Sequence, residues 1–142
     1  MTNQSAVIAV VIRDSQANIV RAAAQLVLQT EALVAEALAI RFGLIQAKSL
    51  TSGAIICESD ASLMVKALSS SLSSCPWPLS NIHKDCNLLI SGFESVEFLW
   101  TTNFADHNLA KWCRLSNSLG VIDISKVPNL VFLNGEEWSD SA

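Results

Sequence analysis

Two acidic side chains stand at positions where the local sequence offers no partner for their charge. Glu36 lies within "TEALVAEALAIRFGLIQAKS", and the residues three and four positions away on a helix are alanine, leucine and isoleucine. Asp60 ends the short apolar run "AIICESD". A carboxylate in such a place reaches to water, pairs with a distant base, or binds a metal ion. Taken alone, Glu36 is more often explained by water or a distant base.

Asp60 presents a similar choice, because "ASLMVKAL" after it is typical of a helix. As an N-cap, its carboxylate would accept bonds from the first turn, a common role that contributes about 1 kcal/mol. The two acids together are more informative, since a helix packed on a sheet brings an acid in the helix near an acid at a strand end. Two-metal phosphoryl chemistry needs several carboxylates to hold two Mg²⁺ ions about 3.5–4 Å apart. Glu36 and Asp60 are therefore candidate metal ligands.

The elements that must position these acids follow from the hydrophobic pattern. Residues 6–12 and 19–28 are apolar runs around the turn sequence "RDSQAN", which predicts an antiparallel hairpin. Further strands are predicted at 54–59 and 96–100, and helices at 30–49, 60–68, 81–91 and 103–115. This alternation predicts an α/β protein whose site lies at the carboxyl ends of its strands. After Ser116 we expect a loose tail that docks some apolar side chains.

Composition narrows the classes of function. The chain has 142 residues, of which 51% are hydrophobic, and this suits one domain with a core. Its net charge of −4 excludes nucleic-acid binding by bulk electrostatics, so any cationic patch must form on folding. The four cysteines share no C-x-x-C spacing, which indicates thiols rather than a zinc site. The apolar run 6–12 is too short for a signal or a membrane span, so we expect an intracellular protein, nuclear or cytoplasmic.

Four blocks of sequence together resemble a known family. They are "VVIRDSQANIVRAA", "AEALAIRFGLIQAKSL", "IICESDASLMVKAL" and "NFADHNLAKWC". In this order and spacing they resemble the RNase H-type domain of plant retroelement-derived proteins, also called reverse transcriptase-like. The resemblance implies an RNase H-like mixed sheet with flanking helices over residues 6–116, followed by a tail at 117–142. It also implies binding of RNA–DNA hybrids and hydrolysis of their RNA strand with two Mg²⁺ ions.

The resemblance also assigns site residues. The acid of the family's first long helix falls on Glu36, and the acid at its strand end falls on Asp60, which we expect both to cap a helix and to face a metal. The fourth acid position falls on His107, while Asp106 lies one residue earlier and points about 100° away on a helix. Mg²⁺ prefers oxygen ligands, so His107 would handle a proton or steer product, and Asp106 would be the ligand.

One departure from the family affects both fold and function. The family's first strand, which carries an Asp-Gly pair, has no counterpart here, and none of the first five residues is acidic. That strand is central in the family, so its loss would leave two sheet edges open and the metal site weakened or lost. The chain closes up differently, a partner supplies a strand, or the sequence is an N-terminally truncated product of a retroelement-derived gene. The last is the simplest explanation.

Three functions follow from this resemblance. The first is a magnesium-dependent RNase H-type endonuclease acting on RNA–DNA hybrids. The second is an inactive module that binds nucleic acid without cutting it, through Lys111 and Arg114, which are three residues apart and share a helix face. A solvated helix end is the more common explanation of two such cations. The third is a fragment of a retroelement-derived gene with no function of its own.

Overall fold

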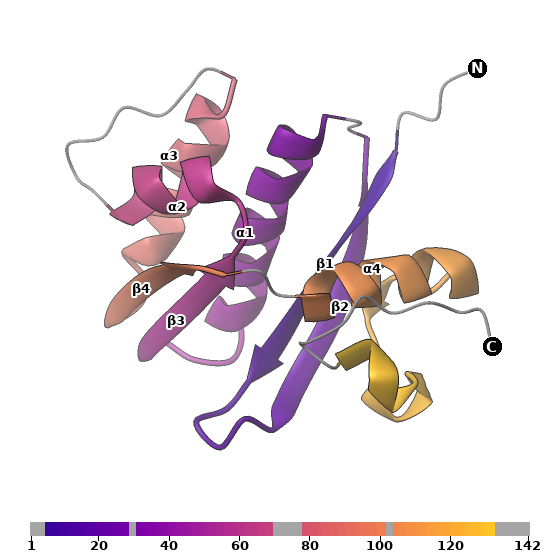
Figure 1. The fold of residues 1–142 in the computed structure, drawn as a ribbon. Coiled ribbons are helices and arrows are strands. Elements are labelled where there is room, and N and C mark those ends of the chain that lie inside the picture. The colour runs from indigo at the N-terminus through magenta and orange to yellow at the C-terminus, as the bar shows by residue number, and fades with distance from the viewer. Residues whose placement is uncertain (1–4, 29–30, 70–77, 102–103, 133–142) are drawn as a thin grey trace. The chain divides into compact units, whose positions relative to one another are not determined.

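The computed structural model describes residues 5–28, 31–69, 78–101 and 104–132 (Figure 1). The chain divides into two compact units. The terminal unit consists of residues 1–28 and 103–142, and the middle unit consists of residues 29–102. Among the described residues, none of the helices combines the length and apolar character needed to cross a bilayer.

The terminal unit begins with the predicted hairpin. Strands β1 (Ala6–Arg13) and β2 (Ile19–Val27) pair in antiparallel register. Asp14 organises the turn between them, because its Oδ1 accepts hydrogen bonds from the amides of Gln16 and Asn18, each at 2.9 Å. A side chain that bonds to the backbone of its own turn is a frequent device for reversing the chain. The hairpin prediction is confirmed.

Helix α4 (Phe104–Ser116) packs on this hairpin, and the segment after it completes the unit (Figure 1). A short strand, β5 (Gly120–Val121), pairs antiparallel with β2. Two 3₁₀ helices follow, η1 (Ile124–Lys126) and η2 (Asn129–Phe132). The expected docking of apolar side chains is therefore confirmed, whereas the looseness expected after Ser116 is wrong for residues 118–132.

The core of the terminal unit explains why this segment is ordered. Its buried side chains come from the hairpin, from α4 and from the segment after α4. They are Ala9, Ala22, Ala24, Leu109, Cys113, Ile122, Val127, Val131 and Phe132. Four of these nine positions lie beyond Ser116, so the hairpin and α4 alone would leave much apolar surface in water. A further bond fixes the segment, since Arg13 Nη2 donates to the carbonyl of Phe132 at 3.0 Å.

The described residues of the middle unit form three helices and two strands, in the predicted order. They are α1 (Ala32–Lys48), β3 (Ala54–Ser59), α2 (Ser62–Ser69), α3 (Ser80–Ile90) and β4 (Ser95–Trp100). Strands β3 and β4 pair in parallel, with Ala54 opposite Ser95 and Ser59 opposite Trp100. A parallel pair needs a crossover connection, and α2 and α3 provide it.

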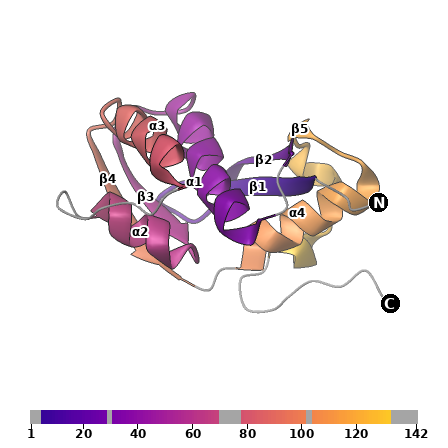
Figure 2. The same ribbon diagram turned by 90° about the horizontal axis from the view of Figure 1, so that it is seen from above.

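Helix α1 is the scaffold of the middle unit. It lies beside α3, as Figure 2 shows, and it also contacts β3. Its sequence is apolar almost throughout, and its buried residues accordingly lie on several of its faces: Val34, Ala37, Ile40, Phe42, Leu44 and Ala47. A salt bridge of 2.8 Å between Arg41 Nη1 and Asp85 Oδ2 joins α1 to α3. His83 Nε2 lies 3.0 Å from the carbonyl of Ala67 and joins α3 to α2.

The strands of the described residues form two sheets. One has the order β1-β2-β5, and the other is the β3-β4 pair. The fold is α/β, with antiparallel and parallel strands and flanking helices, as predicted. In these two sheets β1 and β3 are both edge strands. The resemblance implies that the family's central strand pairs with these two strands.

Candidate functional site

Glu36 and Asp60 both belong to the middle unit. Glu36 lies in the second turn of α1 and is half-buried, and Asp60 follows β3 directly and is also half-buried. The short connection between α1 and β3 makes these two contacting elements run in opposite directions. Measured along the helix, Glu36 lies roughly 18 Å from the C-terminal end of α1. Measured along the strand, Asp60 lies roughly 20 Å from the N-terminal end of β3. We infer that both acids lie at the same end of the middle unit.

The start of α2 differs slightly from the prediction. The helix begins at Ser62, and the carbonyl of Ala61 accepts its first bond, from the amide of Val65. The N-cap position is therefore Ala61, one residue after Asp60. The amide of Ala61 donates to Ser59 Oγ at 3.0 Å, so Ser59 supplies a side-chain acceptor at this helix start. The helix therefore begins one residue later than expected, because the chain makes one more residue of turn before it. Capping by the Asp60 carboxylate stays a prediction.

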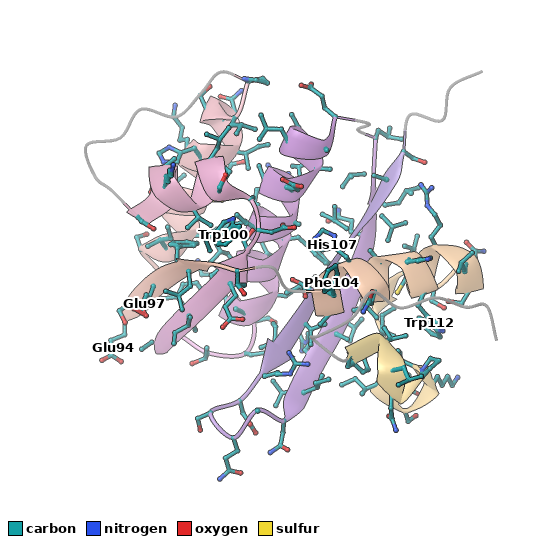
Figure 3. All side chains as sticks on the ribbon, viewed as in Figure 1. Glu94, Glu97, Trp100, Phe104, His107 and Trp112 are labelled. Atoms are coloured by element: carbon teal, nitrogen blue, oxygen red, sulfur yellow. The ribbon has the colours of Figure 1, made fainter. Side chains whose placement is uncertain are left out.

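Asp106 and His107 belong to the terminal unit, in the first turn of α4. Asp106 is half-buried, and its Oδ1 accepts a hydrogen bond of 3.1 Å from the amide of Val11 in β1. His107 is exposed on the same helix, where Figure 3 labels it. The two side chains therefore differ in environment, as their 100° separation on a helix predicts. One carboxylate oxygen of Asp106 therefore already accepts a hydrogen bond from the edge strand β1.

The exposed face of α4 carries three basic or titratable side chains. His107, Lys111 and Arg114 are spaced by four and three residues, and all three are exposed. Residues at these spacings lie on one side of a helix, with their Cβ atoms about 5–6 Å apart. Arg114 Nη2 also donates to the carbonyl of Ser5 at 3.0 Å, which uses one of the five N–H donors of the guanidinium. The expected sharing of a face by Lys111 and Arg114 thus extends to His107.

A two-magnesium centre needs more carboxylates than Glu36 and Asp60 supply within the described part of the middle unit. Within the part of the chain that the structure describes, no group of three or more His, Cys, Asp or Glu side chains is placed to hold a metal ion. Two Mg²⁺ ions need several carboxylates to fill their octahedral shells. Burial raises the pKa of the Cys113 thiol to about 11, and a thiol is in any case a poor ligand for Mg²⁺, which takes oxygen ligands. The four positions assigned by resemblance therefore stay predictions as metal ligands.

The order of elements and the packing of helices on the two sheets define an RNase H-like α/β fold. The structure is similar to the crystal structure of RNase H1 from the halophilic archaeon Halobacterium salinarum NRC-1, with a TM-score of 0.62 and 18% sequence identity. The likeness covers 68% of this chain and 74% of that one. Residues 1–113 match the reverse transcriptase-like family, and the chain belongs to this family. Comparison with curated protein sequences gives no significant match.

Proposed function

We propose that this chain is an RNase H-type domain that binds RNA–DNA hybrids through the exposed face of α4. The observation that carries the proposal is the row His107, Lys111 and Arg114 on that helix. Membership of the reverse transcriptase-like family and the RNase H-like fold support the choice of nucleic acid as the ligand. Phosphate oxygens are the natural partners of such a row, since they accept bonds from lysine and arginine and from a protonated histidine.

The charge of the chain sets the kind of binding that we expect. A net charge of −4 gives no general attraction for a polyanion, so affinity depends on the local row of cations. On B-DNA, each phosphate neutralised by lysine or arginine contributes about −0.9 to the slope of the logarithm of the association constant against the logarithm of the salt concentration. Contacts by Lys111 and Arg114 alone would give a slope of about −2. The binding is therefore expected to be weak and to fall steadily as salt rises.

Hydrolysis of the RNA strand is the second candidate function. It is favoured by the position of Glu36 and Asp60 at the same end of the middle unit. Glu36 and Asp60 are two carboxylates, whereas two Mg²⁺ ions need several, and for this reason we place binding without efficient cleavage first. The retroelement origin and the nuclear or cytoplasmic location stay predictions.

The test is a titration of a short fluorescent RNA–DNA hybrid with the full chain at several salt concentrations, read by anisotropy. Lys111→Gln is expected to reduce the salt slope by about 1 and to weaken binding at low salt. The matched control is Lys84→Gln, since Lys84 is an exposed lysine on α3 of the other unit. Equal loss in both variants, or none in Lys111→Gln, would contradict the assignment of the α4 face.

A further inference from the structure

The last residue of β4 is a tryptophan whose side chain is largely exposed to water. Side chains alternate along a strand, so Val96, Phe98 and Trp100 lie on the same side of β4 (Figure 3). Val96 is half-buried and Phe98 is 9% exposed, whereas Trp100 is 57% exposed. The cover on this side of the strand therefore ends between Phe98 and Trp100.

The exposure of Trp100 calls for an explanation from binding. An indole ring carries a large apolar area, and tryptophan side chains are highly buried on average. A ring left in water adds little to the stability of the fold. Tryptophan is, however, enriched at surfaces that bind ligands, because its rigid ring supplies a large contact area. Trp100 is thus a candidate contact for a ligand.

The carboxyl ends of β3 and β4 meet beside this ring. The two strands are parallel, and Trp100 is paired in register with Ser59, the last residue of β3. The amide of Thr101 donates to the carbonyl of Ser59 at 2.9 Å and ties the two strand ends together. Asp60 follows Ser59 directly. In open α/β sheets ligands bind outside the carboxyl ends of the parallel strands, so Trp100 lies at the end of the sheet where a ligand is expected.

We propose that Trp100 binds an unpaired base of a single-stranded nucleic acid by stacking. Every base has a flat π-face that can stack on an indole ring, whatever the sequence. The bases of a duplex are already stacked on their neighbours, so the ring can hold only a base that is unpaired. The site belongs to the middle unit and does not include the α4 face. It shares with the proposed function only the choice of nucleic acid as ligand, which the family and the fold support.

A nucleobase suits the surroundings of the ring better than a protein segment does. The neighbours of Trp100 along its own strand and across the pair, Thr101 and Ser59, are polar and half-buried. Leu99 is exposed and apolar, but it points to the opposite side of β4. Aromatic anchors for protein partners lie at the centre of a larger, fully desolvated surface. One ring among polar neighbours is sufficient to hold one base.

The experiment uses the full chain and two short fluorescent RNA strands of equal length, oligoadenosine and an abasic strand with the same backbone. Anisotropy is expected to show about five- to tenfold tighter binding of oligoadenosine. Trp100→Leu keeps apolar bulk without a ring and should remove this difference, whereas Trp100→Phe keeps a ring and should retain most of it. Leu99→Ala is the control on the other side of β4 and should change nothing. Urea unfolding checks that each variant is folded.

A second measurement identifies the ring that contacts the base. The chain has four tryptophans, and in protein labelled with 5-fluorotryptophan the resonance of Trp100 is the one absent from Trp100→Phe. Oligoadenosine should shift this fluorine resonance, and the abasic strand should leave it in place. Lys111→Gln should lower the salt slope and preserve the preference for oligoadenosine, so failure of the α4 assignment can be told from failure of this one.

Three results would overturn the proposal. The first is equal affinity of the wild-type chain for the two strands, which would favour a protein partner as the occupant of the ring. The second is equal behaviour of Trp100→Phe and Trp100→Leu, since stacking needs the ring. The third is a Trp100 resonance that oligoadenosine does not move.

Discussion

The amide of Val11 in β1 donates a hydrogen bond of 3.1 Å to Oδ1 of Asp106 in α4, across 95 residues of sequence. Val11 lies in an edge strand, whose outward N–H groups have no neighbouring strand among the described residues. The carboxylate thus satisfies one donor of an open sheet edge and holds α4 against the hairpin. This gives Asp106 a structural role that does not require a metal.

Replacement of Asp106 should measure this structural role. Asp106→Ala leaves the half-buried Val11 amide without its acceptor, and we expect the free energy of unfolding to fall by about 1–2 kcal/mol. Asp106→Asn keeps an oxygen acceptor and should cost less. Urea unfolding at neutral pH measures both. The control is Asp85→Ala, which removes an exposed salt bridge to Arg41 and should cost at most about 1 kcal/mol. An unchanged stability of Asp106→Ala would contradict the structural role.

Cleavage of an RNA–DNA hybrid in the presence of Mg²⁺ tests the second candidate function. We expect the wild-type chain to bind the hybrid with little or no cleavage, because Glu36 and Asp60 are only two of the several carboxylates that two Mg²⁺ ions need. Any cleavage that does occur should disappear in both Glu36→Gln and Asp60→Asn, since a neutral amide is a much weaker Mg²⁺ ligand than a carboxylate. A denaturing gel of the labelled RNA strand measures this. The control is Glu97→Gln on the exposed face of β4. Rapid cleavage by wild type, or cleavage that survives in Asp60→Asn, would refute this prediction.

The turn at Asp14 should make part of the stability depend on pH. Backbone hydrogen bonds, first from Asn18 and then from Gln16, lower the pKa of the Asp14 carboxyl below its usual value. A lowered folded-state pKa stabilises the fold above the unfolded pKa of about 3.9, and this stabilisation is lost as the pH falls through the folded value. Asp14→Asn should therefore lower the Tm at pH 6, and the difference from wild type should shrink as the pH falls below about 4.

The matched variant for this pH series is Ser15→Ala, which changes a neighbouring side chain of the turn and leaves Asp14 in place. Its Tm should follow that of the wild type over the whole range. A difference between Asp14→Asn and wild type that stays constant down to pH 2 would show that the carboxylate charge is not involved.

Ala17 is held in a backbone conformation that favours glycine. Its φ is 68°, in the left-handed region, where a Cβ costs about 1–2 kcal/mol. Ala17→Gly should raise the free energy of unfolding by about 0.5–1 kcal/mol, after allowance for the larger freedom of glycine in the unfolded chain. Thermal or urea unfolding measures this. Ala110→Gly in α4 is the opposite control and should destabilise by about 1 kcal/mol. Destabilisation by both changes would mean that the turn does not strain Ala17.

Much of the fold could be predicted because its signals are local. The apolar runs on either side of "RDSQAN" predicted the hairpin, and the helix-forming runs predicted α1, α2, α3 and α4 within a few residues. The segment 118–132 could not be predicted as ordered, because its strand has two residues and its side chains are buried in a core shared with the hairpin and α4. Periodicity gives little information about so short an element.

The candidate site shows the same division. Glu36 and Asp60 stood out because they are charged residues next to apolar runs, and this can be seen without a structure. The acceptor role of Asp106 could not be predicted, because its partner is a backbone N–H that any residue except proline provides. The exposed face of β3 was also not predicted, although the alternation of exposed Ile56 and Glu58 with partly buried neighbours is a visible signal of a strand with one exposed face.

The sequence by itself determined the order and type of the elements, because propensity, turn chemistry and hydrophobic spacing act over a few residues. It also indicated Glu36 and Asp60 as candidate site residues. Only the tertiary structure decided that the strands form two sheets, that Asp106 satisfies the edge of β1, and that three titratable side chains share the outer face of α4. These features depend on groups brought together from distant parts of the chain, and hydrogen bonding and burial of that kind arise only when the chain has folded.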